Sequence, residues 1–87
     1  MDISIFGLGY VGMVSAACLA EGGHTVIGID LNLTKVDLVN NGRSPIIEKG
    51  LDDLVGNGVR EGRILATQNT EEALKRSSIS LVCVGTP

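Results

Sequence analysis

The amino-acid sequence predicts an α/β fold built on a doubly wound parallel sheet, and three observations support this prediction. Short apolar segments with the composition of strands alternate along the 87 residues with segments of helical character. This order is typical of parallel strands joined by helical crossovers. The apolar run at residues 79–84 is almost uninterrupted, as expected of a parallel strand covered on both faces. Three closely spaced glycines follow the first strand. A chain of this length forms one small domain.

The first strand and helix occupy the N-terminal quarter of the chain. Residues 2–6 are apolar and rich in strand-forming side chains, and they lead directly into the glycines. Residues 11–21 carry small and apolar side chains, which suit a helix packed closely against a sheet. Gly22 and Gly23 then stand where helices commonly end.

A second strand and helix follow. Residues 24–30, HTVIGID, read as a buried strand that ends in an acid. Either Asn32 or Thr34 is expected to cap the second helix, which extends to about Asn40. Residues 43–50 contain a proline and a terminal glycine and are expected to form a loop.

The third helix is predicted from apolar residues at helical spacing, namely Leu51, Leu54, Val55 and Val59. Gly56 and Gly58 lie within it, and glycine in a helix interior is destabilising by roughly 1 kcal/mol relative to alanine. We therefore expect this helix to be short or frayed.

The last quarter of the chain predicts one strand, one short helix and one further strand. Residues 63–67 read as the third strand. Thr70 is expected to cap a helix over residues 71–77. Residues 79–84 form the fourth strand.

Composition and charge exclude several classes of protein. The net charge is −3 and the basic residues are dispersed, which argues against a nucleic-acid-binding protein. Residues 3–20 carry no charge, but they follow an acid, Asp2, and include the three glycines, so neither a signal peptide nor a membrane span is expected. We expect a cytoplasmic protein.

The two cysteines, Cys18 and Cys83, lie in apolar runs and far apart. They do not have the spacing of a metal site or a redox pair. We expect buried free thiols, and we assign no metal-binding residue.

The glycines at positions 7, 9 and 12 have the spacing of a dinucleotide-binding motif of the Rossmann type. Gly7 permits a tight turn after the strand. Gly9 leaves room for a pyrophosphate beside the backbone, and Gly12 lets the helix approach the sheet closely. The phosphates are expected at the helix N-terminus, where free N–H groups favour negative charge.

Asp30 strengthens this interpretation, because it ends the second strand eighteen residues after Gly12. Its carboxylate can accept hydrogen bonds from both hydroxyl groups of an adenosine ribose, and it repels a 2′-phosphate by something on the order of 1–4 kcal/mol. The sequence therefore predicts NAD as the cofactor in preference to NADP. Lys35, five residues later, reads on spacing alone as a solvated surface lysine.

Three segments together resemble the UDP-glucose/GDP-mannose dehydrogenase family. They are GLGYVG at residues 7–12, SPIIEKGL at 44–51 and CVGTP at 83–87. They follow one another at the spacing of that family and cover the whole chain. The segment ISIFGLGYVG and the serine before the proline resemble the GDP-mannose 6-dehydrogenase branch more than the UDP-glucose 6-dehydrogenase branch.

The resemblance implies an enzyme that oxidises the C6 hydroxymethyl group of GDP-mannose or UDP-glucose to a carboxylate, with two NAD and a thiol-bound intermediate. It also implies cofactor contacts. Tyr10 and Val11 would contact NAD at the glycine turn, Asp30 would hold the adenosine ribose, and Lys35 would support it. Thr86 would line the cofactor site at the end of the fourth strand.

The resemblance further implies that residues 1–87 are the N-terminal part of an NAD-binding Rossmann domain. The catalytic cysteine, the catalytic lysine and the sugar-binding domain of the family lie beyond them, and neither Cys18 nor Cys83 matches the nucleophile. The chain alone is therefore expected to be inactive. We also expect self-association through strand 79–84, whose apolar edge would lack its next neighbour.

Three other classes of protein remain as alternatives: another NAD-dependent dehydrogenase, a non-enzymatic nucleotide-sensing regulatory domain, and an S-adenosylmethionine-dependent methyltransferase. The sensing domain shares the glycine motif and the acid after the second strand, but it gives no reason for SPIIEKGL or for VGTP. The methyltransferase spaces its glycines differently.

Overall fold

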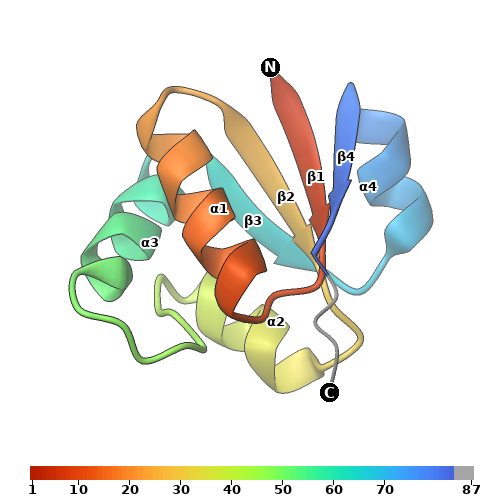
Figure 1. Cartoon of the computed structure of the whole chain (residues 1–87). Coiled ribbons are helices and arrows are strands. Elements are labelled where there is room, and N and C mark those ends of the chain that lie inside the picture. Colours follow the sequence, from red (N-terminus) through yellow and green to blue (C-terminus); the bar gives the residue numbers. More distant parts are fainter. Residues whose placement is uncertain (84–87) are drawn as a thin grey trace.

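Four apolar segments form the strands of one parallel sheet. In the computed structural model, which describes residues 1–83, they are β1 (Asp2–Phe6), β2 (Thr25–Ile29), β3 (Ile64–Thr67) and β4 (Ile79–Val82). The strands lie in the order β3-β2-β1-β4, and all neighbours are parallel (Figure 1). The chain thus moves outward from β1 to β3 and returns to the other side of β1 for β4. This order confirms the predicted doubly wound sheet.

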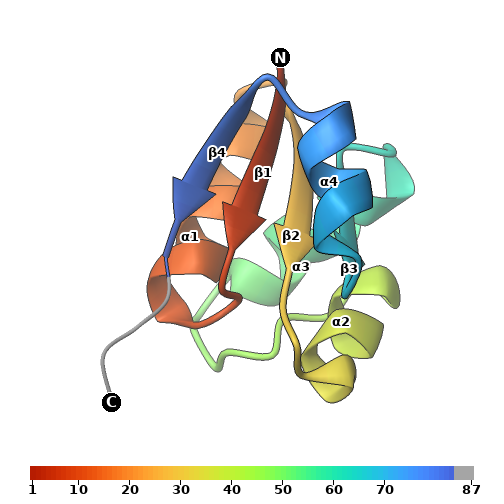
Figure 2. The ribbon, with the colours of Figure 1, turned by 90° about the vertical axis from the view of Figure 1, so that its right-hand side faces the viewer.

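Helices cover both faces of the sheet. They are α1 (Tyr10–Glu21), α2 (Leu33–Asn40), α3 (Leu51–Arg60) and α4 (Thr70–Arg76). Figure 2 shows α4 in front of the sheet, with α1 and α3 behind it. The larger core lies on the side of α1 and α3, and the smaller one, around Ile27, Ile29 and Ala73, lies beneath α4. Within residues 1–83, no helix combines the length and apolar character that crossing a membrane requires.

Helices α1, α2 and α3 end in the same way, with a glycine of positive φ one residue beyond the cap. At the end of α1, the N–H of His24 donates to the carbonyl of Leu19 at 3.1 Å, and the N–H of Gly23 donates to that of Ala20 at 3.0 Å. These two bonds define a Schellman motif, which satisfies carbonyl groups that the helix leaves free. The predicted role of the Gly22-Gly23 pair is confirmed.

A side chain pairs with one residue at the outer edge of β3. The Nδ2 of Asn40, at the end of α2, donates to the carbonyl of Ala66 at 2.9 Å, and the N–H of Ala66 donates to Oδ1 of Asn40 at 2.8 Å. The amide group of Asn40 therefore occupies both main-chain groups of Ala66, as a neighbouring strand would.

Two helix predictions need correction. Helix α3 is ten residues long and is neither short nor frayed. Its Gly58 is buried against Ile64 of β3, so tertiary packing outweighs the low helix propensity of glycine. Thr70 is the first residue of α4 and not its cap. The cap is Asn69, because from there Oδ1 reaches the N–H of Glu72 at 3.0 Å.

The limits of the other two helices, α1 and α2, agree more closely with the prediction. Of the two candidate caps for α2, the structure selects Asn32, whose Oδ1 accepts from the N–H of Lys35 at 3.3 Å. Helix α2 ends at Asn40, as predicted. Helix α1 begins one residue earlier than predicted, at Tyr10.

Two burial predictions were wrong. Cys18 is exposed, because α1 turns it away from the sheet while its neighbours Ala16 and Ala17 face the core, and Cys83 is half-buried. All four residues of β4 are exposed, because the strand lies at the rim of the sheet and the described chain covers it only partly. Val84, the last residue of the predicted strand, lies outside the described residues.

Candidate functional site

The candidate site lies at the edge of the sheet where the strands end. The carboxyl end of β1 leads into α1, and that of β2 leads into α2, so the two connecting turns lie at one end of the molecule (Figure 1). Ligands of open parallel sheets bind outside these carboxyl ends. The glycine turn and the acid of the sequence prediction are both located here.

The turn from β1 to α1 depends on its first and last glycines. Gly7 has φ 100°, a conformation that L side chains rarely adopt, and its N–H donates to the carbonyl of Ile29 at 2.8 Å. A Cβ on Gly12 would lie 1.8 Å from the carbonyl oxygen of Gly7, so no side chain fits there. The tight turn and the close approach predicted for these glycines are confirmed, although Gly12 approaches the turn itself more closely than the sheet.

Gly9 differs from these two glycines. It has an ordinary extended backbone (φ −83°, ψ −161°), and within the described part of the chain no atom beyond its two chain neighbours lies within 4 Å of a Cβ placed on it. The packing of residues 1–83 therefore does not require a glycine at this position. The space in front of Gly9 is open to a ligand.

The N-terminus of α1 also has no side-chain cap from residues 1–83. Its cap, Gly9, offers no side-chain acceptor, and the first turn holds no acidic residue. By contrast, Asn32 caps α2, Asn69 caps α4, and α3 has Asp52 and Asp53 in its first turn. Of the four helices in residues 1–83, α1 alone leaves its N-terminal N–H groups and positive dipole end without an acceptor or an acid. Such an end favours an anion.

Asp30 joins the two turns of the site. Its Oδ2 accepts from the N–H of Leu8 at 2.9 Å, and its Oδ1 accepts from the N–H of Asn32 at 2.9 Å. The Nζ of Lys35 lies 4.0 Å from Oδ2. Partial burial acts to raise the pKa of the Asp30 carboxyl group, but the two donated N–H groups and the ammonium group outweigh it. The pKa therefore lies below its ordinary value, and the group is ionised at neutral pH.

The structure brings most of the predicted site residues to this one end of the sheet. Tyr10 and Val11 form the first turn of α1, and more than half of each residue is exposed. Lys35 lies on the first turn of α2 and faces Asp30. Thr86 lies outside the described residues.

Sequence reasoning did not identify Leu8 as part of the site. Leu8 lies between two turn glycines, yet it is only 1% exposed, and its N–H is the donor to Asp30. A signal was present in the sequence: Gly28 interrupts the apolar strand β2, and glycine within a strand often marks the close approach of another segment.

A pocket of about 370 Å³ opens beside Asp30. Its lining residues are Phe6, Gly7, Ile29, Asp30, Leu31 and Thr70. Most of this lining is apolar, and among residues 1–83 the carboxylate is its one charged group. Such a lining can pack against a flat ring while the carboxylate accepts hydrogen bonds from hydroxyl groups.

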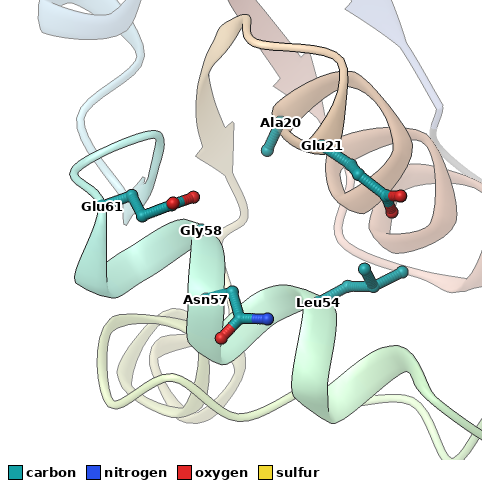
Figure 3. Close-up of a pocket in the computed structure, with 6 residues that line it drawn as sticks. All are labelled: Ala20, Glu21, Leu54, Asn57, Gly58 and Glu61. Atoms are coloured by element: carbon teal, nitrogen blue, oxygen red, sulfur yellow. The ribbon is translucent and has the colours of Figure 1, made fainter.

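A second pocket, of about 280 Å³, lies between α1 and α3 (Figure 3). Figure 3 shows that Glu21, at the end of α1, and Glu61, just beyond α3, both border it. Two carboxylates disfavour a phosphate ligand, and this pocket lies at the opposite end of α1 from the glycine turn. We therefore place the candidate site at the glycine turn.

Comparison with known proteins gives one consistent family. The sequence model described as the UDP-glucose/GDP-mannose dehydrogenase family, NAD binding domain, matches residues 1–87. The chain is 52% identical over 87 residues to the GDP-mannose 6-dehydrogenase of Pseudomonas savastanoi pv. phaseolicola, covering 100% of the chain and 20% of that protein. Over the same coverage it is 40% identical to the UDP-glucose 6-dehydrogenase of Rhizobium meliloti.

Solved structures show the same likeness. A ternary complex of GDP-mannose dehydrogenase from Pseudomonas aeruginosa superposes with a TM-score of 0.98 at 53% identity, covering 100% of this chain and 20% of that one. A UDP-glucose dehydrogenase from Pyrobaculum islandicum gives a TM-score of 0.92 at 38% identity, covering 99% of this chain and 20% of that one. The chain thus spans about a fifth of the length of these relatives.

Proposed function

This chain belongs to the UDP-glucose/GDP-mannose dehydrogenase family as its NAD-binding domain, and on that premise we propose where NAD binds and what the longer enzyme does. The glycine turn at residues 7–12 and the N-terminus of α1 bind the pyrophosphate, and Asp30 binds the adenosine ribose. The enzyme that contains this domain oxidises the C6 hydroxymethyl group of a nucleotide sugar to a carboxylate. This four-electron oxidation consumes two NAD, and each bound NAD supplies a hydride acceptor.

The observation that carries this proposal is the free N-terminus of α1. Its N–H groups lack a side-chain cap, its first turn lacks an acid, and Gly9 stands beside it with open space where a side chain would be. An anion placed there satisfies the donors and interacts favourably with the helix dipole. The residues present therefore fit the pyrophosphate of NAD.

Asp30 supports NAD over NADP. The carboxylate is ionised, and each of its oxygen atoms accepts one backbone N–H, which leaves further lone pairs for two ribose hydroxyl groups. The ammonium group of Lys35 lies 4.0 Å from this carboxylate, at a place where it would support the same ribose. The apolar lining of the adjacent pocket suits the adenine ring.

GDP-mannose is the substrate that we propose for the longer enzyme. Six GDP-mannose 6-dehydrogenases are 52–54% identical to this chain, whereas two UDP-glucose 6-dehydrogenases are 39–40% identical. We assign no catalytic residue to the chain itself. Incubated alone with NAD and GDP-mannose, it is expected to form no NADH.

Calorimetric titration with NAD and with NADP tests the cofactor site. Gly9→Ala is expected to fold normally but to bind NAD about tenfold or more weakly, because its methyl group occupies the space proposed for the phosphates. Asp30→Ala is expected to weaken NAD binding and to reduce the preference over NADP.

Gly22→Ala is the matched control for these titrations. Gly22 lies at the other end of α1 in a right-handed conformation, and an added Cβ would make only ordinary contacts of 3.4 Å or more. This variant is expected to bind NAD like the unaltered chain. Equal NAD binding by Gly9→Ala and the unaltered chain would place the pyrophosphate elsewhere, and tighter binding of NADP than of NAD would refute the role of Asp30.

A further inference from the structure

The side chain of Leu8 fills the space that Gly28 leaves in the middle of β2. A Cβ on Gly28 would lie 2.7 Å from Cδ2 of Leu8 and 3.3 Å from its Cδ1. Leu8 is 1% exposed, although it belongs to a turn at the edge of the sheet. The turn therefore inserts one leucine over the strand, at the one position of β2 that has no side chain.

Polar contacts hold the same turn to the same strand. The N–H of Leu8 donates to Asp30, and the N–H of Gly7 donates to the carbonyl of Ile29. Three consecutive residues at the end of β2 thus hold the turn in different ways. Gly28 leaves room for the side chain of Leu8, Ile29 accepts a hydrogen bond through its carbonyl group, and Asp30 accepts one through its carboxylate.

We propose that Leu8 and Gly28 are positioning residues that hold the glycine turn in the shape required to bind the pyrophosphate of NAD. This inference rests on the proposed function of the turn. Neither residue needs to touch the cofactor. They act through the backbone N–H groups of the turn and of the start of α1, whose directions depend on how deeply Leu8 is seated. A turn that is already shaped loses less conformational freedom on binding, and this strengthens affinity.

A double-mutant cycle on the 87-residue chain tests the proposal. Gly28→Ala pushes Leu8 outward, and its Kd for NAD is expected to rise roughly tenfold, because overpacking a filled site shifts the backbone. Leu8→Val removes one methylene group and is expected to weaken binding less. The double variant Gly28→Ala/Leu8→Val conserves volume and is expected to bind NAD nearly as well as the unaltered chain.

Gly58→Ala is the matched control. Gly58 is also buried, and a Cβ there would lie 2.4 Å from Cδ1 of Ile64, but this contact joins α3 to β3 and not to the glycine turn. The variant is expected to lower stability while leaving the Kd for NAD unchanged. A loss of NAD affinity in Gly58→Ala as large as that in Gly28→Ala would attribute the effect to general destabilisation and overturn the proposal.

A second measurement uses no cofactor and no variant. In the unaltered chain without NAD, the amide proton of Leu8 is expected to exchange with solvent slowly, because it is bonded to Asp30 beneath a buried side chain. Rapid exchange would show that the turn is not held in advance, and would overturn the inference even if Gly28→Ala failed to fold.

The two proposals can fail separately. If the unaltered chain does not bind NAD, the proposed function of the turn fails, whatever the exchange rate of Leu8. If the unaltered chain binds NAD but the effects of the Leu8 and Gly28 substitutions on Kd are simply additive, only the positioning role fails.

Discussion

At the scale of single residues, Asp30 links the glycine turn to the start of α2. Its carboxylate is bonded to backbone N–H groups on both sides, from Leu8 and from Asn32. A carboxylate that accepts such bonds in the folded state is favoured in its ionised form. Asp30 therefore contributes to the stability of the chain as well as to the proposed cofactor site.

This contribution depends on pH. Because the pKa of folded Asp30 lies below the ordinary value of 3.8, its contribution is fully present above that value and is lost as pH falls through the lowered pKa. Between about pH 5 and pH 2, the free energy of unfolding is expected to fall less steeply in Asp30→Asn than in the unaltered chain. Urea denaturation followed by circular dichroism at several pH values measures this difference.

Asp37→Asn serves as the control for the pH series. Asp37 is an exposed acidic residue of α2, the helix that follows Asp30. Its substitution is expected to leave the pH profile close to that of the unaltered chain. If Asp30→Asn and the unaltered chain had parallel profiles, the backbone bonds to Asp30 would not stabilise its ionised form.

Part of the site at this scale could be predicted from the sequence. The spacing of the glycines was sufficient to predict the turn at Gly7 and the close approach at Gly12, since both follow from local backbone geometry. The bond between Leu8 and Asp30 could not be predicted, because it joins residues 22 positions apart and depends on how deeply the turn is seated. The exposure of Cys18 was not predicted, because α1 carries small and apolar residues on all of its sides. Its sequence therefore does not show which side faces the sheet.

At the scale of elements, the cap of α4 provides a direct test of the structure. Asn69→Ala removes the acceptor for the N–H of Glu72 and is expected to lower the free energy of unfolding by about 0.5–2 kcal/mol. Thr70→Ala, one residue later, leaves the cap in place and is expected to have a smaller effect. Thermal or urea denaturation of both variants measures these changes. A larger loss of unfolding free energy in Thr70→Ala than in Asn69→Ala would identify Thr70 as the cap.

The elements themselves were largely predictable, because their patterns are local. Apolar runs, helix caps and terminal glycines identified four strands and four helices in the correct order. The length of α3 was underestimated, because helix propensity alone counts its glycines as destabilising. In the folded chain Gly58 is a packing site for Ile64, and that contact cannot be seen before the sheet is assembled.

At the scale of the whole molecule, β4 presents an apolar edge. Ile79, Leu81 and Val82 are 38–72% exposed, and in the described chain β4 pairs with β1 alone. Exposed strand edges associate with other strands. The 87-residue chain is therefore expected to self-associate as its concentration rises, and Leu81→Lys is expected to suppress this association.

Leu74→Lys is the control for this prediction. Leu74 is 50% exposed, but it lies on α4 and not on a strand edge. Sedimentation equilibrium over a range of concentrations compares the three chains. A monomeric unaltered chain at high concentration, or equal suppression by both lysine substitutions, would contradict association through β4.

The fold class was predictable at this scale because alternating elements and buried runs constrain the topology strongly. The exposure of β4 was not predictable, because an apolar sequence cannot show which strand lies at the rim of the sheet. The family match confirms the resemblance drawn from three short motifs and confirms NAD as the cofactor. The assignment of individual residues to NAD remains a prediction.

The amide group of Asn40 makes the two edges of the sheet, β3 and β4, unequal. A filament grows only when each added molecule presents a free strand edge to the next one. At the edge formed by β3, the main-chain groups of Ala66 are already paired with a side chain of the same molecule. If two copies pair through β4, the free β4 edge of each copy is occupied by the other. Assembly through this strand is therefore expected to stop at a symmetric pair, and propagation into a fibril would first have to displace Asn40 from Ala66.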